Sequence, residues 1–369
     1  MASARLRHGS PEQAGLDPEQ INALAAEMDE LPRRGWCAGA VVVAGRGPYL
    51  VLRHATGWAS RWSTAGALAD EPERMRPDTP FDLASLTKLF TAVAVLQQVE
   101  RGTLDLDRPA AAYVREFGGA GKAAITLRQL LTHTSGLRPE LPFHDGHGLE
   151  LLWAERPLSG RRHRYSDLNF LALQQVLEQV TGQGLDVLLG ECVTGPLRMS
   201  ATRFGPVLGA AATEDQRRPR AKADRGMLRG VVHDENAYAL GGVAGHAGLF
   251  GTADDLAVFC RALLGGGAYG RARILAPDSV ALLLDAPGLG FAVDQPWFMG
   301  ELAGRGAAGH TGFTGTSLVV DRATDTFLVL LANTVHPVRP AVPDSGPRAA
   351  AATRLARAVR QRPPRLSSR

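Results

Sequence analysis

The chain has 369 residues, of which 45% are hydrophobic and 21% charged, and its formal net charge at pH 7 is +4. A chain of this length can bury a large core, and its composition is ordinary for a globular protein. The basic residues are scattered without an aromatic ladder and no stretch is apolar over the width of a membrane, so we expect neither a nucleic-acid nor a membrane partner. The amino terminus lacks the apolar core of a signal peptide, which favours a cytoplasmic location.

Few residues are arranged as ligands for a metal ion. The three cysteines are far apart, without the paired spacing of a zinc site, and we expect reduced, mostly buried thiols. They are Cys37, Cys192 and Cys260. The segment His233–Asn236 carries several polar side chains, but no second cluster of His or Cys accompanies it. We therefore predict neither a metal nor a cofactor.

The first third of the chain predicts a helix, a hairpin and a second helix. The first helix is expected over residues 17–31, and two strand-like runs within 38–54 are joined by a turn that contains glycine and proline. Residues 70–80 are polar and contain proline, so we expect an irregular connection there. From Asp82 apolar residues recur at helical spacing as far as Gly102, which predicts a helix buried on most sides.

The rest of the chain predicts helices in its middle and strands near its end. Residues 105–240 are rich in helical patterns and loops, and 198–229 carry few signals of order. Further along we expect a helix over 252–264, strands over 317–321 and 326–332, a helix over 349–359 and a disordered tail over 361–369.

These elements predict an α/β (α+β) fold whose antiparallel sheet is built from amino- and carboxyl-terminal segments and flanked by helices. Residues 1–104 and 241–369 would form this sheet domain. Residues 105–240 would be an inserted, mainly helical domain, and we expect the active site between the two.

A serine and a lysine lie one helical turn apart at the start of the buried helix. Ser85 and Lys88 are three positions apart, so their Cβ atoms are about 5–6 Å apart on one helix face. A serine hydroxyl needs a neighbouring base to become a nucleophile, and a lysine whose pKa is lowered by burial can be that base. Because Ser-x-x-Lys also arises by chance, with the serine as a helix cap, the pair needs support from elsewhere in the chain.

Two further segments provide that support. Tyr165-Ser166-Asp167 precedes a predicted helix, and His310-Thr311-Gly312 precedes a predicted strand. Together with Ser85-x-x-Lys88, and in this order, they resemble the three motifs of serine β-lactamases and penicillin-recognising enzymes. The likeness is greatest to the class C-like branch, which also holds esterases, D-amino-acid peptidases and acyltransferases. Residues 130–137 and 241–250 are similar to segments of that branch.

The resemblance implies a mechanism. Ser85 would attack a carbonyl carbon and form an acyl-enzyme, while Lys88 and Tyr165 share the roles of general base and general acid. The backbone N–H groups of Ser85 and Phe313 would form the oxyanion hole, where each donor is worth about 3 kcal/mol at the transition state. The residues expected to bind substrate are Asp167, His310, Thr311, Gly312 and Asn169.

Two departures from the family pattern bear on the substrate. The second motif usually ends in Asn, whereas Asp167 here would hold Lys88 charged and shift the role of base towards Tyr165; Asn169 would then be the amide that contacts substrate. His310 stands where β-lactamases usually carry Lys, and a histidine partly charged near pH 7 would hold a carboxylate weakly. Both changes favour an esterase, amidase or acyltransferase over an efficient β-lactamase.

Three functions remain open from the sequence. The leading hypothesis is hydrolysis of an ester or amide through acyl-Ser85, with a small-molecule acyl substrate. An acyltransferase would use the same intermediate with a small-molecule acceptor in place of water. A non-catalytic penicillin-recognising binding protein is the alternative of another class, and the retention of Ser85, Lys88 and Tyr165 argues against it. The sequence leaves the oligomeric state open.

Overall fold

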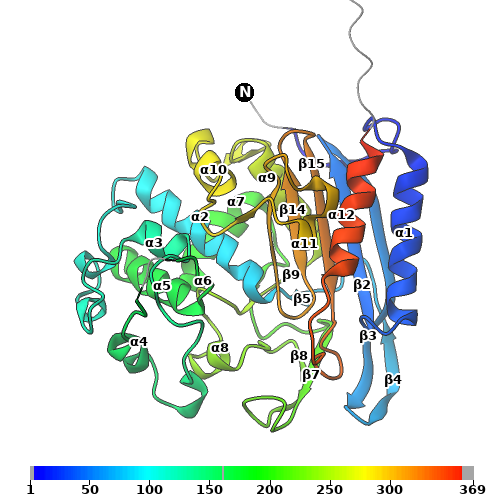
Figure 1. Cartoon of the computed structure of the whole chain (residues 1–369). Helices are drawn as coiled ribbons and strands as arrows, with labels where there is room; N and C mark the ends of the chain where they lie inside the picture. The colour runs from blue at the N-terminus through cyan, green and yellow to red at the C-terminus, as the bar shows by residue number, and fades with distance from the viewer. Residues whose placement is uncertain (1–3, 160–161, 360–369) are drawn as a thin grey trace, which may run out of the picture.

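The structure, a computed structural model, describes residues 4–159 and 162–359 and confirms the predicted fold (Figure 1). Its main feature is an eight-stranded sheet with the order β1-β3-β2-β15-β14-β13-β12, in which β4 pairs with β3. All the pairings are antiparallel except that of β1 with β3. The strands are β1 (Arg7–His8), β2 (Gly39–Arg46), β3 (Tyr49–Thr64), β4 (Ala67–Arg74), β12 (Ala292–Val293), β13 (Ala308–Thr311), β14 (Ser317–Asp321) and β15 (Thr326–Ala332).

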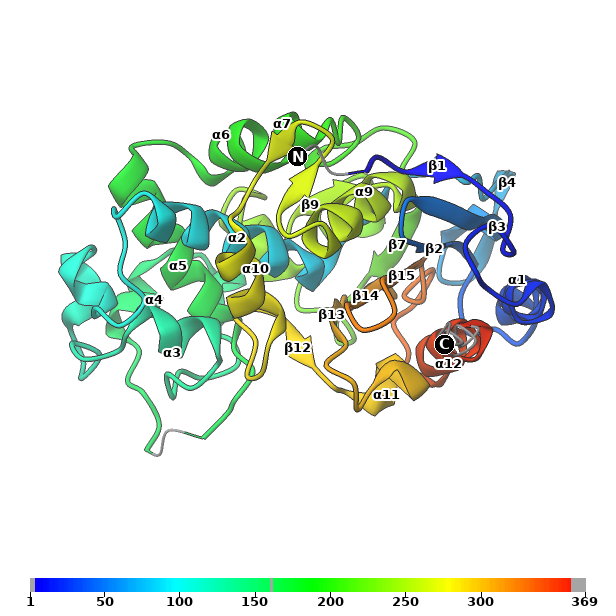
Figure 2. The same ribbon diagram turned by 90° about the horizontal axis from the view of Figure 1, so that it is seen from above.

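The amino- and carboxyl-terminal halves of the sheet meet where β2 pairs with β15, in a register that runs from Ala40 opposite Ala332 to Arg46 opposite Thr326. Helices α1 (Pro18–Arg33) and α12 (Gly346–Ala358) pack together on one face, and α9 (Ala253–Leu264) covers the other (Figure 2). Because both faces are covered, β2 and β15 are apolar without alternation. The side chains of β2 alternate between the two hydrophobic cores, one on each face.

Helix α2 (Thr87–Glu100) lies beside α9 and packs against α5 (Asp167–Thr181). Residues 87–98 of α2 are all buried, as the apolar pattern predicts. A short 3-10 turn, Ala84–Leu86, precedes α2, so Ser85 lies in this turn and not in the α-helix itself.

Most of the remaining helices lie on the side of the molecule away from α1 and α12, whereas the last of them packs against α12 (Figure 1). They are α3 (Leu127–Leu131), α4 (Glu150–Ala154), α6 (Leu185–Leu189), α7 (Gly195–Leu197), α8 (Glu235–Ala239), α10 (Pro277–Leu284) and α11 (Pro296–Met299), with 3-10 turns at Ala110–Ala112, Arg115–Gly118, Phe143–Asp145 and Gly300–Leu302 and a π-helical turn at Gly190–Thr194. The small sheets contain β5 (Phe81–Asp82), β6 (Arg203–Phe204) and β9 (Leu249–Gly251), β7 (Ala212–Gln216) with β8 (Gly226–Arg229), and β10 (Ala268–Tyr269) with β11 (Ala272–Arg273).

Two predictions of irregular structure were wrong. Within 70–80 the chain continues β4 to Arg74, and within 198–229 it forms β6, β7 and β8. Strand β4 is exposed along nearly its whole length and β7 buries polar side chains, so neither shows the apolar pattern by which strands are recognised. The hairpin of β7 and β8 contacts β3, so part of residues 105–240 lies against the main sheet.

The tail predicted to be disordered, 361–369, lies outside the described residues. Among the helices that the structure describes, none combines the length and apolar character needed to cross a membrane.

Candidate active site

The turn that carries Ser85 is held in an unusual backbone conformation. Ala84, directly before it, has a positive φ of 48°, which is costly for a residue with a side chain. The buried carboxylate of Asp82 holds this turn, since its two oxygens accept from the Ala84 N–H (2.9 Å) and the His233 N–H (2.6 Å). Ser85 itself is partly exposed in the wall of a large cavity.

The strand with the third motif packs against the same turn. His310 and Thr311 belong to β13 itself and do not merely precede a strand, as the sequence had suggested. Thr316 Oγ1 donates to the Leu83 carbonyl (3.0 Å), and Gly312 lies so close that a Cβ there would be 2.6 Å from that carbonyl oxygen. A glycine is therefore required at this contact. The packing brings residue 313, a predicted oxyanion donor, to the turn that carries Ser85, the other.

Lys88 is fully buried, and its amino group contacts three groups besides Tyr165. Its Nζ lies 2.9 Å from Ser85 Oγ, 3.2 Å from the His246 carbonyl oxygen and 2.7 Å from Asp167 Oδ1. Burial by itself would lower the pKa of Lys88, but the charge of Asp167 and the contact with Tyr165 raise it, and the net direction is upward. The effect of burial that the sequence predicted is present but is outweighed, and the net direction agrees with the second expectation, that Asp167 would hold Lys88 charged.

Tyr165 completes the cluster. Both Lys88 and Ser85 interact with its hydroxyl and act to lower its pKa, and Lys88 Nζ lies 4.9 Å from the centre of its ring. Desolvation raises the pKa of Tyr165, although 40% of the residue is exposed, and the opposing effect of the Lys88 charge is smaller. At neutral pH the resting cluster is therefore a lysinium, a carboxylate and a neutral phenol. Ser85 has two potential proton acceptors, each of which must first lose a proton.

The ring of His310 lies beside that of Tyr165, with ring centres 5.8 Å apart. Burial, together with the charge of Lys88, lowers the pKa of His310 to about 4. The imidazole is thus neutral near pH 7, and the expected partial charge was wrong because the ring is buried. Its Nδ1 lies 2.7 Å from the Thr311 carbonyl oxygen and so donates to it, which leaves Nε2 as an acceptor. This side chain cannot bind a carboxylate through charge.

Asn169 does not take the place expected of it. The residue is fully buried, and its Oδ1 accepts from Ser135 Oγ (2.6 Å) while its Nδ2 donates to His133 Nδ1 (2.9 Å). Its amide therefore supports the cavity wall from behind and is not free to contact substrate. Asp167, His310, Thr311, Gly312 and Phe313 do line the cavity.

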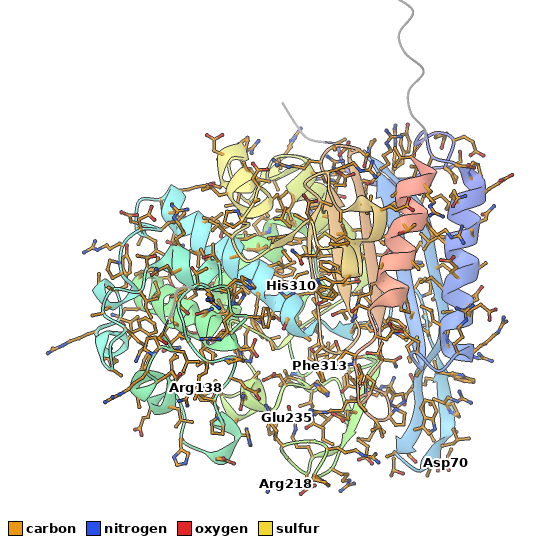
Figure 3. The ribbon with its side chains drawn as sticks, in the orientation of Figure 1. Asp70, Arg138, Arg218, Glu235, His310 and Phe313 are labelled. Carbon is orange, nitrogen blue, oxygen red and sulfur yellow. The ribbon has the colours of Figure 1, made fainter. Side chains whose placement is uncertain are left out.

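The cavity has a volume of about 1610 Å³. Pockets for small ligands usually measure about 300–1,000 Å³, so this one has room for more than the acyl group. It runs from the helical side, near His163 and Tyr165, to α1, α11 and α12. Figure 3 shows His310 and Phe313 between these two sides.

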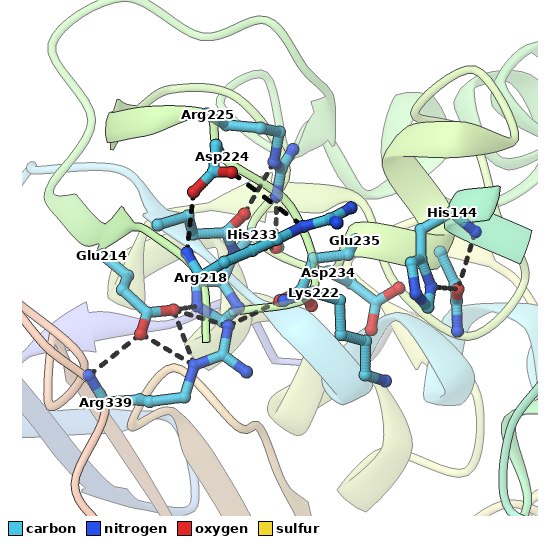
Figure 4. Close-up of polar contacts among 12 residues, drawn as sticks. His144, Glu214, Arg218, Lys222, Asp224, Arg225, His233, Asp234, Glu235 and Arg339 are labelled. Atoms are coloured by element: carbon cyan, nitrogen blue, oxygen red, sulfur yellow. Dashed lines mark hydrogen bonds and ion pairs between the residues drawn. The ribbon is translucent and has the colours of Figure 1, made fainter. Parts of the chain in front are cut away.

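The rings and charges around Phe313, which contacts both His233 and Arg339, belong to a network of paired charges, shown in Figure 4. Arg339 pairs with Glu214 at 2.6 Å and with Glu235 at 2.7 Å, and Glu214 also contacts His233 Nε2 at 2.9 Å. The side chains of His233 and Glu235 are thereby engaged with protein partners. This part of the cavity is polar but carries little unpaired charge.

Sequence reasoning missed Asp234, which also lines the cavity. Ligand atoms of Asp167, Asp234 and His246 lie within 4.8 Å of one another, an arrangement that could hold a metal ion. In this structure Lys88 is the partner of Asp167, and His246 Nε2 lies 3.1 Å from Asp234 Oδ1, so these charges are paired within the protein. Both residues lie in segments that the sequence had marked, 233–236 and 241–250, but no pattern predicted that the two would meet.

A partly exposed serine bonded to a buried lysine and a tyrosine, between a sheet and a helical region, is the arrangement of the penicillin-recognising serine hydrolases. The sequence profile described as "Beta-lactamase" matches residues 24–353, and the chain belongs to this family. It is a β-lactamase-family serine hydrolase.

Named relatives differ in substrate. The chain is 31% identical to an Escherichia coli K12 protein that carries the provisional name D-alanyl-D-alanine carboxypeptidase, over 90% of this chain and 86% of the relative. It is 30% identical to the N-acetylmuramyl-L-alanine amidase of Bacillus subtilis 168, over 87% and 85% of the two chains. The structure is similar to that of EstCE1, a hydrolase with promiscuous acyltransferase activity, with a TM-score of 0.71, 21% identity and coverage of 93% and 99%.

Proposed function

We propose that the protein hydrolyses an ester or amide through an acyl-Ser85 intermediate. The observation that carries this proposal is the contact network of Lys88, whose Nζ bonds Ser85 Oγ at 2.9 Å and pairs with Asp167 at 2.7 Å, beneath the Tyr165 hydroxyl. A structural lysine buried to this degree would not need a hydroxyl nucleophile at the surface of a cavity as its partner.

In the proposed cycle, the reactive form of the cluster has lost one proton shared between Lys88 and Tyr165. The Ser85 hydroxyl gives its proton to this pair as Oγ attacks the carbonyl carbon, and the resulting oxyanion accepts hydrogen bonds from the N–H groups of Ser85 and Phe313. The pair returns the proton to the leaving oxygen or nitrogen as the scissile bond breaks. Water then attacks the acyl-enzyme by the same steps in reverse order, which releases the acid and restores Ser85.

Acyl transfer is a second candidate, and the size of the cavity favours it. A volume of about 1610 Å³ leaves room for an acceptor beside the acyl group. An alcohol or amine that reaches acyl-Ser85 would react through the same proton transfers as water. The similarity to EstCE1, named as a hydrolase with promiscuous acyltransferase activity, agrees with this candidate.

The neutral state of His310 argues against an efficient β-lactamase. Penicillins carry a carboxylate, and an uncharged imidazole with Nε2 as an acceptor does not attract one. We therefore propose uncharged esters or amides as better substrates than penicillins.

Intact-mass measurement of the full chain tests the proposal. The protein is incubated separately with a p-nitrophenyl ester, a D-amino-acid amide and a penicillin, with Ser85→Ala as the matched control. We expect an increase in mass equal to the acyl group in the parent and none in Ser85→Ala. A parent that neither gains mass nor releases p-nitrophenol would refute the hydrolase and favour the non-catalytic binding protein. A faster release of p-nitrophenol on addition of an alcohol, with formation of the new ester, would identify the transferase.

A further inference from the structure

Arg348, in the first turn of α12, contacts the peptide group that carries the second of the two oxyanion donors. Its Nη2 donates to the Gly312 carbonyl oxygen (3.2 Å), and its Nη1 donates to Ser345 Oγ (3.0 Å). The Gly312 carbonyl belongs to the same peptide group as the Phe313 N–H. The backbone N–H of Gly315 also donates to this carbonyl oxygen (3.1 Å), so two donors from different segments hold it.

The direction of this carbonyl determines the direction of the Phe313 N–H. A peptide group is planar and trans, so its C=O and N–H bonds point in opposite directions. Among residues 4–159 and 162–359 the Phe313 N–H has no hydrogen-bond partner, so it is available to an oxyanion. A charged donor on the carbonyl side also polarises the peptide group, since linked hydrogen bonds strengthen one another, and makes its N–H a better donor.

The position of Arg348 is unfavourable for a cation. The residue is only 7% exposed, its two acceptors are uncharged oxygens, and its Nε has no partner among the described residues. It also lies at the amino-terminal end of a helix, where the helix dipole disfavours positive charge. Burial lowers the pKa of Arg348 to about 10, and the charge of Asp344 opposes this only in part. A neutral side chain could anchor α12 at lower cost, so anchoring does not explain the charge.

We infer that Arg348 is a positioning residue for the reaction, which orients and polarises the peptide group between Gly312 and Phe313 so that the Phe313 N–H meets the oxyanion. It acts through this peptide group and does not touch the substrate. Its effect belongs to the steps in which negative charge develops on the substrate carbonyl oxygen, which occur in both acylation and deacylation. This inference rests on the proposed hydrolase function.

Two variants of Arg348 and one control separate orientation of the peptide group from anchoring of the helix. Arg348→Met removes the charge and its hydrogen bonds, and we expect it to fold because the Gly315 N–H still holds the carbonyl oxygen. Arg348→Lys is the conservative variant, which keeps a charged donor without the planar fork of the guanidinium. Arg357→Met is the matched control, because Arg357 lies on the same helix and pairs with Glu301 outside the cavity.

The substrates are the p-nitrophenyl esters of butyric acid and of succinic acid, of which only the second carries a carboxylate. They distinguish positioning from direct binding of an anion, because Arg348 also lines the cavity. Phenylboronic acid reports on the oxyanion hole, since its boron becomes tetrahedral and negatively charged when Ser85 Oγ adds to it, as the substrate carbon does in the transition state. For each protein we measure kcat, KM, the inhibition constant of phenylboronic acid and the melting curve.

We expect kcat of Arg348→Met to fall about tenfold on both esters with KM nearly unchanged, which is the effect of one hydrogen bond to a charged group. The inhibition constant of phenylboronic acid should rise by a similar factor, Arg348→Lys should recover part of both losses, and Arg357→Met should match the parent.

Four results overturn the inference. A loss confined to the succinate ester, or a higher KM with a normal kcat, would show that Arg348 binds substrate. An unchanged kcat would show that it has no part in the reaction, and a lower kcat with an unchanged inhibition constant would show that it acts only on the fold. A parent that hydrolyses neither ester and gains no mass refutes the hydrolase itself, which is a separate outcome.

Discussion

Replacement of Asp167 by Asn tests the most unusual feature of the site. The change restores the residue usual in the family and removes one charge with almost no change in shape. In the parent, Asp167 Oδ1 lies 2.7 Å from Lys88 Nζ, with Lys88 fully buried and the Asp167 side chain 25% exposed. The carboxylate raises the pKa values of both Lys88 and Tyr165, so the proton that must leave before Ser85 can react is held more tightly.

Removal of the Asp167 carboxylate should therefore lower the pKa values of both Lys88 and Tyr165. Without the carboxylate both groups lose their proton more easily, so the reactive form is present at lower pH. An opposite charge at contact distance shifts a protonation equilibrium by about 1–3 pH units. We therefore expect the alkaline rise of kcat/KM in Asp167→Asn to move by at least about one unit towards acid, and the rate at pH 7 to increase.

The assay is ester hydrolysis between about pH 6 and pH 10, corrected for spontaneous hydrolysis and compared with Ser85→Ala as the blank. Thermal unfolding followed by circular dichroism confirms that the variant is folded, and we expect a lower Tm because a buried lysinium loses its partner. A profile that does not move, or that moves towards alkali, would refute the assignment of Asp167 as the group that keeps Lys88 protonated.

Two further predictions concern the frame of the site. Gly312→Ala should lower kcat by about 100-fold or more, which is the loss typical of one oxyanion donor. The reason is that the added Cβ would lie 2.1 Å from Thr316 Oγ1 and 2.6 Å from the Leu83 carbonyl oxygen. Steady-state ester kinetics, with an unchanged circular dichroism spectrum, would establish this loss, and a normal kcat would contradict it. Glu214→Gln tests the pair with Arg339. Burial acts to raise the pKa of Glu214, but its bonded partners lower this pKa from 4.5 to about 2. The carboxylate therefore stabilises the fold above pH 4.5, and this contribution is lost as the pH falls to 2. The stability gap between parent and variant should shrink by about 3 kcal/mol over that range in denaturant titrations, and a constant gap would count against it.

The sequence alone was sufficient to predict the architecture of the fold and the protein family. Continuous apolar runs predicted β14 and β15 with their observed bounds, because a strand covered on both faces needs apolar side chains at every position. Helix α2 was predicted for the same reason. The exposed strand β4 and the polar strand β7 were not predicted, because their side chains lack the apolar pattern of a buried strand.

For the site, the sequence indicated which residues to consider, through the order and spacing of Ser85, Lys88 and Tyr165. It gave two opposite expectations for the protonation of Lys88, from burial and from Asp167, and could not decide between them. The pKa of Lys88 depends on whether burial or the charge of Asp167 dominates, and the answer depends on a 2.7 Å distance between residues 79 positions apart. The neutral ring of His310 likewise depends on burial and on neighbours from other segments. The sequence states which ionisable side chains are present. The strength of their electrostatic interactions depends on the distances between the charges and on the access of water to them, which only the tertiary structure decides.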